Sequence, residues 1–236
     1  MDDRNGDNLW RKAIEKEYKN IQVSFKFLDE NSKVPVGYQY IECHWIFDIK
    51  LDLTRKARFV AGGHMTEPPS SMTYASVVSR ETVRIAFLMA ALNDLDILSA
   101  DIGNAYLNAE CREKVYFTAG EEFGMNSGKK VIITKALYGL KSIAAAWRAH
   151  LAQTMYDLQF HPCLADPDLW MRKATKPDGD TYWEYVLIYV DDILVISHKP
   201  DKIMNCLSEL YRLKEDPVTK KRFDKPISYL GADIGI

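Results

Sequence analysis

The sequence has 236 residues, and its 31 lysine and arginine residues against 33 acidic ones give a formal net charge of −2. Hydrophobic residues make up 47% and charged residues 27%, which is typical of a globular protein and excludes disorder along the whole chain. The balanced charge lacks the basic excess of a dedicated nucleic-acid-binding protein, so a nucleic-acid function would depend on local segregation of charge.

The sequence gives no sign of a membrane span or of secretion. Its hydrophobic runs, such as 86–92 and 185–190, are far shorter than the roughly 20 residues of a spanning helix. The polar N-terminus lacks the hydrophobic segment of a signal peptide. Four cysteines without C-x-x-C spacing predict buried thiols in a reducing compartment. We therefore expect an intracellular protein, in the cytoplasm or the nucleus, that is neither secreted nor bound to a membrane.

The first third of the sequence predicts one helix and one hairpin. Residues 8–20 are expected to form an amphipathic helix, because hydrophobic side chains recur four apart between charged ones. The aromatic and β-branched residues of 39–51 predict a strand, and 55–60 is its expected hairpin partner. Gly62 and Gly63 end that partner strand, and 68–71 is expected to be a loop.

Helices and strands alternate in the middle of the sequence. Ser79 is a suitable N-cap for a helix that ends near residue 92. Further elements are expected as a strand over 96–101, a turn or short helix over 103–107, a strand around 115–117 and a loop over 120–130.

The last part of the sequence predicts a helix over 141–159 and a turn region over 162–167, where Asp166 and Asp168 are expected to cap a turn rather than to bind a metal. Asp178-Gly179 is a strong hairpin signal. A last helix over 201–213 and a strand over 227–236 are also expected. Strands mixed with helices and joined by hairpins predict an α+β fold rather than a doubly wound parallel sheet.

Two adjacent aspartates, Asp191 and Asp192, are all that separates the strand-like runs 182–190 and 193–197. One interpretation is an ordinary hairpin turn with solvated carboxylates. A tight hairpin turn usually contains glycine, however, and the flanking runs are hydrophobic on both faces, as in a buried sheet. Desolvating two neighbouring carboxylates is costly unless cations hold them, so a site for divalent metal ions is the other interpretation.

A third carboxylate, Asp101, ends the strand 96–101 and is followed by Gly103 and Tyr106. An aspartate at a strand end is more often a helix cap than a ligand. Together with the aspartate pair, however, it provides three carboxylates at strand ends, and hard oxygen ligands suit Mg²⁺. Paired ions of this kind can activate an attacking hydroxyl and stabilise a leaving phosphate. From the residues alone, a metal-binding α+β domain for some other phosphoryl transfer stays open.

The tetrapeptide Tyr189-Val190-Asp191-Asp192 (YVDD) is similar to the catalytic hairpin of reverse transcriptases, and 101–106 resembles their first catalytic motif. Three more blocks follow the order found in copia-type retrotransposons: 55–64, 73–80, and 136–142 followed by Trp147. The match extends from about residue 9 to residue 231. The chain thus resembles the RNA-directed DNA polymerase domain, a nucleotidyltransferase, of a copia-type retrotransposon polyprotein.

This resemblance implies a right-hand polymerase fold with palm and fingers, in which an antiparallel palm sheet packs on helices. It implies one domain over 1–236, with fingers at roughly 20–95 and part of 110–160, and with palm at roughly 96–109 and 160–236. The thumb, RNase H, integrase and protease of the polyprotein are expected to be absent.

The implied reaction adds dNTPs to the 3′-hydroxyl of a primer on an RNA or DNA template, with two Mg²⁺ ions that Mn²⁺ can replace. Asp101, Asp191 and Asp192 match the catalytic carboxylates that bind both ions, and the Ile102 backbone matches a further metal ligand. Residues implied in nucleotide binding are Lys56, Arg58, Gly103, Asn104, Ala105, Tyr106 (as a steric gate against ribonucleotides), Lys141 and Ser142. Residues implied in template or primer contact are Tyr189, Val190 and Gly139.

Two features favour an alternative function. Ile143 is bulky and follows a block that lines the nucleotide side in the family, and the thumb that grips the duplex is expected to be missing. The alternative is a truncated, catalytically inactive retrotransposon remnant with at most weak nucleic-acid binding. If the chain belongs to a longer element, the rest of the polyprotein is an expected partner.

Overall fold

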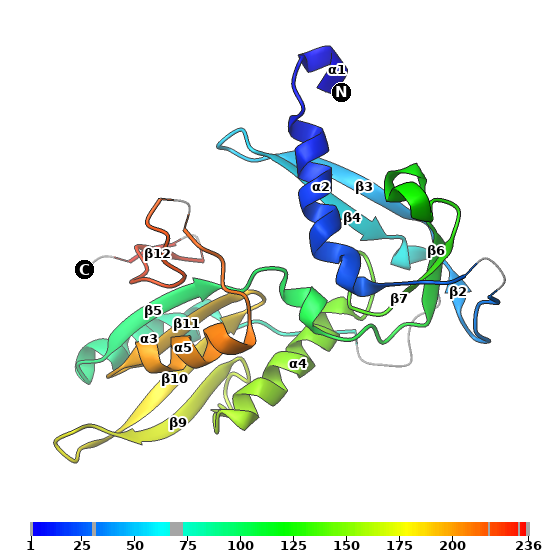
Figure 1. Ribbon diagram of the computed structural model, residues 1–236. Helices are drawn as coiled ribbons and strands as arrows, with labels where there is room; N and C mark the ends of the chain where they lie inside the picture. Colours follow the sequence, from blue (N-terminus) through cyan, green and yellow to red (C-terminus); the bar gives the residue numbers. More distant parts are fainter. Residues whose placement is uncertain (1, 30–31, 67–72, 217, 231, 235–236) are drawn as a thin grey trace. The chain divides into compact units, whose positions relative to one another are not determined.

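The computed structural model describes residues 2–29, 32–66, 73–216, 218–230 and 232–234. The chain divides into two compact units, each built from two stretches of sequence (Figure 1). We call 1–74 with 106–150 unit 1, and 75–105 with 151–236 unit 2. Each unit has its own sheets and its own hydrophobic core.

Unit 1 combines a small sheet, a long hairpin and an N-terminal helix pair. Its α-helices are α1 (Asp2–Asn5) and α2 (Leu9–Ile21), and its strands are β1 (Phe25–Phe27), β2 (Gln39–Tyr40), β3 (Cys43–Ile49), β4 (Arg55–Ala61), β6 (Val115–Thr118) and β7 (Lys130–Ile133). The sheet has the order β1-β7-β6-β2, and only its β2–β6 pair is parallel. The antiparallel β3–β4 hairpin follows β2 in the sequence and forms a separate two-stranded sheet. Short 3₁₀ turns occur at Gln22–Ser24, Gly63–Met65, Ala105–Asn108 and Glu121–Asn126.

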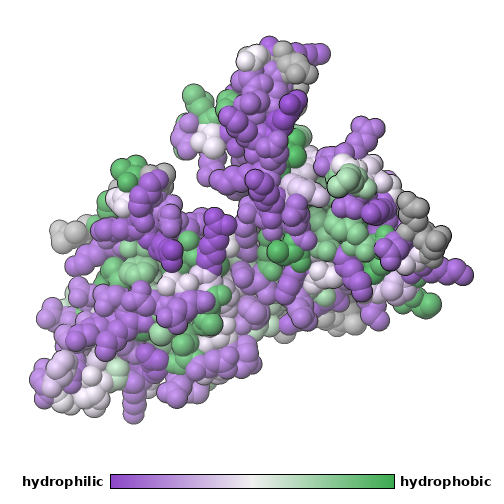
Figure 2. All heavy atoms as spheres, in the orientation of Figure 1, coloured by the Kyte–Doolittle hydropathy of each residue, from purple (hydrophilic) through white to green (hydrophobic). Residues whose placement is uncertain are grey.

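The core of unit 1 is rich in phenylalanine. Phe25, Phe59, Phe117 and Phe123 pack together, with ring centroids 5.3 to 5.9 Å apart. Side chains of a strand alternate between its faces, and every second residue of β4 from Ala57 to Ala61 is buried. The same alternation leaves Lys56 and Arg58 on the opposite face. The outer side of α2 is hydrophilic (Figure 2).

Unit 2 is built on a five-stranded, fully antiparallel sheet in the order β5-β11-β10-β9-β8. Its strands are β5 (Asp96–Asp101), β8 (His161–Pro162), β9 (Leu169–Thr175), β10 (Thr181–Tyr189) and β11 (Asp192–Ser197). Its helices are α3 (Arg80–Leu92) and α5 (Pro200–Leu210), and α4 (Ile143–Asp157) runs from unit 1 into unit 2. A short hairpin of β12 (Ser228–Tyr229) and β13 (Ala232–Asp233) follows.

Helices cover both faces of the unit 2 sheet. Val83, Ala86 and Ala90 of α3 pack in one cluster with alternate residues of β10 and β11. Helix α5 packs against β5 and β11, and its Ile203, Met204 and Leu207 are buried. The strands are therefore hydrophobic on both faces, which is why Tyr185–Ser197 reads as a nearly continuous apolar run apart from its turn.

The start of α3 depends on residues far away in the sequence. Ser79 caps the helix, since its Oγ accepts a hydrogen bond from Thr82 N at 3.1 Å. Asp166 accepts hydrogen bonds from Ser79 N at 3.0 Å and from Thr82 Oγ1 at 2.6 Å. It also accepts from Asp168 N, so the prediction that Asp166 caps a turn is confirmed. These bonds lower the pKa of Asp166, although burial opposes them.

The predicted mixture of helices and antiparallel sheet is confirmed, with differences at several elements. The expected strand 39–51 is split between β2 and β3, which belong to different sheets. Strand β7 was not predicted, and the expected loop 120–130 contains a 3₁₀ turn. The last helix ends at Leu210, and the described residues of the expected strand 227–236 form two strands of two residues each, β12 and β13. The predicted loop 68–71 lies outside the described residues. No helix in the described ranges is both long and apolar enough to cross a bilayer.

Candidate functional site

Two neighbouring strands bring the three predicted carboxylates together in unit 2. Asp101 ends β5 and lies directly opposite Asp192, the first residue of β11. The backbone N–H of Ile102 donates a 2.8 Å hydrogen bond to the carbonyl oxygen of Asp191, which ties the turn to the end of β5. The sequence prediction that these acids converge is therefore correct in its geometry.

The turn that carries Asp191 differs from the predicted one. Tyr189 pairs with Asp192, so the two turn residues are Val190 and Asp191 rather than the two aspartates. Val190 has φ of 59°, as the first central residue of a type II′ turn requires. A β-branched residue rarely adopts this conformation, and holding it there costs about 1–3 kcal/mol. The sequence offers no glycine to relieve that strain.

A lysine that the sequence analysis did not single out lies among the acids. Lys214 Nζ is 2.5 Å from Asp101 Oδ1 and 3.6 Å from Asp191 Oδ2. Its backbone N–H also donates a 2.8 Å hydrogen bond to the carbonyl oxygen of Asp101. An isolated bridge between Ile102 and Leu213 runs beside it. A single lysine after a helix has no signature in a sequence, so only the backbone pairing reveals its position.

The electrostatics of the acid cluster are under-compensated. Burial raises the pKa of Asp192 to about 6, and the negative charges of Asp191 and Asp101 add to this effect. The positive charge of Lys214 lowers the pKa of Asp192 but does not cancel the rise. Lys214 thus contacts Asp101 and Asp191, and the pKa of Asp192 stays raised in its presence, so added positive charge would stabilise the ionised cluster.

The donor chemistry of this cluster fits a divalent metal ion. Carboxylate oxygens are the ligands that Mg²⁺ prefers. In this cluster two of the carboxylates already form salt bridges with one cation, the ammonium group of Lys214. Across the described ranges, no three His, Cys, Asp or Glu side chains stand ready as ligands around one point. The ligand types suit Mg²⁺ but are not gathered around one point among the described residues, and an incoming ion would have to displace the ammonium group of Lys214.

The backbone after Asp101 is held closely in place. Gly103 N donates a 2.8 Å hydrogen bond to the carbonyl oxygen of Arg212, and a Cβ at Gly103 would lie only 3.2 Å from that oxygen. Asn104 has φ of 55°, and Ala105 is buried. These three residues are positioned firmly, and their contact with a triphosphate stays a prediction.

In unit 1, Tyr138 gathers two of the predicted nucleotide-binding residues. The guanidinium carbon of Arg58 lies 5.7 Å from the centre of the Tyr138 ring, within the range of a cation–π contact. The ring of Tyr106 meets the same ring edge-on, with 5.4 Å between centroids. Lys56 lies two residues from Arg58 and thus on the same face of β4. Unit 1 therefore presents a basic and aromatic cluster.

Lys141, Ser142 and Gly139 have structural partners in unit 1. Lys141 Nζ donates to the carbonyl oxygen of Thr66, and Ser142 donates through N and Oγ to Oε1 of the buried Glu113, at 2.8 and 2.9 Å. Gly139 has φ of 92°, and a Cβ there would collide with the carbonyl oxygen of Ala61. Backbone packing alone explains the glycine. The predicted ligand contacts of these residues stay predictions.

The sequence matches the family described as reverse transcriptase (RNA-dependent DNA polymerase) over residues 30–234, most of its length. The chain belongs to this reverse transcriptase family. Three similar proteins are retrovirus-related Pol polyproteins of plant transposons. They are RE1 of Arabidopsis thaliana at 29% identity over 86% of this chain, RE2 of the same plant at 27% over 89%, and TNT 1-94 of Nicotiana tabacum at 25% over 88%.

The chain spans only 14% to 16% of the length of these polyproteins. Reverse transcriptase homology thus covers nearly all of the chain, whereas the chain corresponds to a small part of each relative. The predicted resemblance to a copia-type reverse transcriptase domain is confirmed, and with it the assignment as an RNA-directed DNA polymerase by resemblance.

Proposed function

We propose that the chain is the polymerase segment of a retrotransposon polyprotein and adds dNTPs to a primer 3′-hydroxyl by a two-metal mechanism. The observation that supports this most is the convergence of Asp101, Asp191 and Asp192 at one edge of the unit 2 sheet. In this proposal unit 2 is the palm and unit 1 contributes the fingers. Its partners are an RNA or DNA template, a primer and the rest of the polyprotein, inside the cell.

Two Mg²⁺ ions at the three aspartates would activate the attacking hydroxyl and stabilise the leaving pyrophosphate. Asp101 and Asp191 are the proposed shared ligands, with Asp192 as the third acid and the Ile102 backbone as a further ligand. The strand pairing of β5 with β11 fixes the spacing of these groups before any ligand arrives. Preorganised charge of this kind is the main contribution that a protein makes to phosphoryl transfer.

Other residues of the chain would bind and orient the substrates. Lys56 and Arg58 are the proposed phosphate contacts, and the Tyr106 ring is the proposed steric gate. In unit 1 the edge-on contact with Tyr138 fixes the orientation of that ring. The template and primer would contact Tyr189, Val190 and Gly139.

Primer extension on an RNA template tests this function. Wild-type protein should extend a labelled DNA primer with Mg²⁺ or Mn²⁺, and Asp191→Asn should abolish extension. Asp178→Asn removes an exposed carboxylate from the other hairpin of β10 and is the matched control, expected to retain activity. Thermal unfolding of both variants checks that they fold. A wild-type protein that folds but extends nothing would support the inactive remnant instead. Ile143, the bulky residue that favours this alternative in the sequence, packs against the hydrophobic core of unit 1.

A further inference from the structure

Strand β3 of unit 1 has one edge without a partner. It forms a two-stranded sheet with β4, and in the part of the chain that the structure describes no strand pairs along its other side (Figure 1). The outer edge of β4 is different, because helix α2 packs against this strand and Ala61 N donates a 2.7 Å hydrogen bond to the carbonyl oxygen of Tyr138. The hairpin therefore offers its β3 side to a further strand.

The hydrogen bonds of the hairpin fix which backbone groups of β3 point outward. The carbonyl oxygen of Glu42 accepts from Gly62 N at 2.7 Å, which makes Glu42 a hydrogen-bonded position of the ladder. Every second residue after it bonds with β4, whereas the N–H and C=O groups of Trp45 and Phe47 point away. Among the described residues, none forms a hydrogen bond with these outward groups. Such a row of unpaired donors and acceptors is a template for another strand.

Hydrophobic side chains are exposed along the same strand. Ile46 is 43% exposed, Phe47 is 40% exposed and Ile49 is 49% exposed. The strand pairs regularly with β4 over its seven residues, Cys43–Ile49, so its backbone is already extended for pairing on the other side. An exposed hydrophobic edge strand of this length is prone to pair with another chain.

The backbone of this edge is complementary to itself. In an antiparallel pair of two copies about a two-fold axis at Ile46, Trp45 of one copy lies opposite Phe47 of the other. Their outward N–H and C=O groups then bond in both directions, and the two aromatic side chains become cross-strand neighbours. The same axis places the two Ile46 side chains opposite each other. Pairing in this register therefore covers exposed hydrophobic side chains at its centre.

The charged residues select this register. With the axis at Ile46, the Glu42 carboxylate faces Lys50 of the other copy, and the His44 imidazole faces the Asp48 carboxylate. An axis one residue earlier would set Glu42 against Asp48, which are both acidic. An axis one residue later would set His44 against Lys50, which are both basic. Of these three registers, the one centred on Ile46 sets acidic residues against basic ones at both positions.

We propose that the chain forms a homodimer through the β3 edge, in which two hairpins make one continuous antiparallel sheet. A second copy fits better than an unrelated strand, because both halves of the charge complementarity lie on this one strand. The contact closes on two copies, since α2 packs against β4 at each outer side of the joined sheet. The inference does not rest on the proposed polymerase activity, since β3 belongs to unit 1 and the three aspartates belong to unit 2.

Disulfide cross-linking of the full chain tests the position of the axis. In the dimer residue 46 faces its own copy in a non-hydrogen-bonded pair, with Cα atoms about 4.5 Å apart, which suits a disulfide. Ile46→Cys in a Cys206→Ser background should therefore cross-link under mild oxidation to twice the 27.1 kDa chain mass. Asp48→Cys is the matched control, because its two copies lie roughly 14 Å apart along the strands and should not cross-link. Equal cross-linking of both variants would overturn the proposal.

A charge exchange tests the register by sedimentation velocity over a concentration series. Glu42→Lys and Lys50→Glu each set like charges together and should weaken the dimer about fivefold. The double variant should restore the wild-type dissociation constant. Within one copy the two residues lie roughly 27 Å apart along the strand, so the restoration requires a second copy. A double variant as weak as the single ones, or a wild type that is monomeric throughout the series, would contradict the dimer.

Lysine at the axis tests the hydrophobic centre of the contact. Ile46→Lys sets two ammonium groups opposite each other and should weaken the dimer about tenfold. Ile85→Lys replaces an isoleucine of α3 that is 60% exposed, and as the matched control it should leave the dissociation constant unchanged. Thermal unfolding checks that each variant folds. Asp191→Asn should dimerise as the wild type does, which separates this inference from the proposed function. Equal weakening by Ile46→Lys and Ile85→Lys would refute the β3 contact.

Discussion

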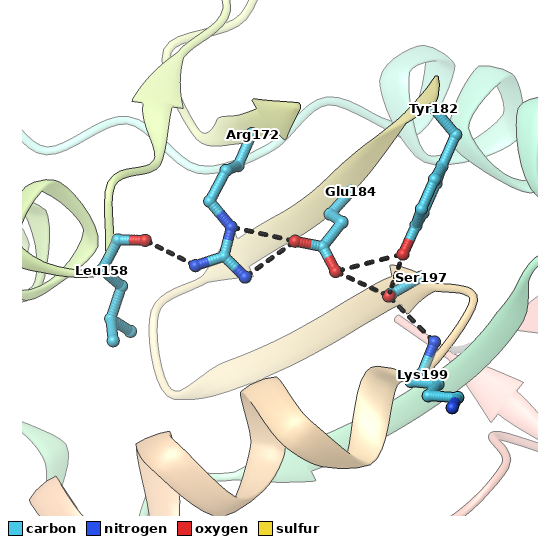
Figure 3. Close-up of polar contacts among 6 residues, drawn as sticks. All are labelled: Leu158, Arg172, Tyr182, Glu184, Ser197 and Lys199. Carbon is cyan, nitrogen blue, oxygen red and sulfur yellow. Dashed lines mark hydrogen bonds and ion pairs between the residues drawn. The ribbon is translucent and has the colours of Figure 1, made fainter. Parts of the chain in front are cut away.

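Carboxylates lie near both ends of strand β10, and the two groups of carboxylates have different surroundings. Near the start of the strand, one oxygen of Glu184 contacts two nitrogens of Arg172, and its other oxygen accepts from a serine and a tyrosine (Figure 3). Past its far end, Lys214 contacts Asp101 and Asp191, the pKa of Asp192 stays raised, and the turn is strained at Val190. A carboxylate whose partners are complete serves the fold, whereas a cluster that lacks positive charge is suited to receiving a cation from outside. The same strand thus carries a structural end and a reactive end.

Removing the arginine should have the largest effect on this comparison. Arg172→Met leaves Glu184 nearly buried without its counter-charge, and we expect the free energy of unfolding to fall by about 2–4 kcal/mol, less than for a fully buried pair because Arg172 is partly exposed. Urea denaturation measures this loss. In Arg172→Met/Glu184→Gln the buried charge is also gone, so the double variant should be more stable than the single one. If it is not, Glu184 does not depend on its partner.

Removing the lysine should strengthen cation binding at the reactive end. In Lys214→Met the internal ammonium group no longer competes, so the affinity for Mn²⁺ should rise about tenfold, which corresponds to about 1.4 kcal/mol. Titration calorimetry without nucleotide gives this affinity directly. Lys221→Met removes a lysine that pairs with Asp224 and is the control. Unchanged Mn²⁺ affinity in Lys214→Met would show that the ammonium group and the metal do not share a site.

The raised pKa of Asp192 predicts a pH dependence. Because its pKa is about 6 in the folded protein and near 3.9 in an unfolded chain, ionisation destabilises the fold. Below about pH 4 Asp192 is protonated in both states and costs the fold nothing. This favourable state is lost as the pH rises through 6 and the folded protein must ionise Asp192. Asp192→Asn should therefore raise the unfolding free energy by about 1 kcal/mol at pH 7, after allowance for partial exposure, and by almost nothing at pH 4. A parallel trend in the variant of the exposed Glu209, Glu209→Gln, would show that the effect is not specific to Asp192 and would refute the assignment.

The two turns that flank β10 give the smallest effect. Gly179 has φ of 97° in one turn, and Val190 has φ of 59° in the other. Val190→Gly should stabilise the protein by about 0.5–1 kcal/mol, because relief of strain exceeds the added chain entropy. Gly179→Ala should destabilise it by a similar amount. Thermal unfolding of both variants tests for strain at Val190. If Val190→Gly destabilises the protein as Gly179→Ala does, Val190 is not strained.

Local signals in the sequence predict much of this molecule. The spacing of Trp10, Ile14 and Tyr18 identified α2, Ser79 marked the start of α3, and Asp178-Gly179 marked the β9–β10 hairpin. The position of Asp101 at a predicted strand end added a third carboxylate to the aspartate pair, and the resemblance then implied the role of all three. Contacts between distant segments were not accessible in this way. Lys214 joins the acids only through backbone pairing, and the position of Val190 in the turn depends on the register between Tyr189 and Asp192.

The interleaving of the two units along the chain affects how the protein is made. After the first stretch of unit 1, the ribosome synthesises α3 and β5, then the second stretch of unit 1, and only afterwards β9, β10 and β11. β5 pairs in its sheet with β11, so it waits unpaired while unit 1 completes its own core. Contacts between segments so distant in sequence form slowly, and an exposed waiting strand is prone to aggregation. Expression at lower temperature, with chaperones present during translation, should therefore raise the yield of native protein.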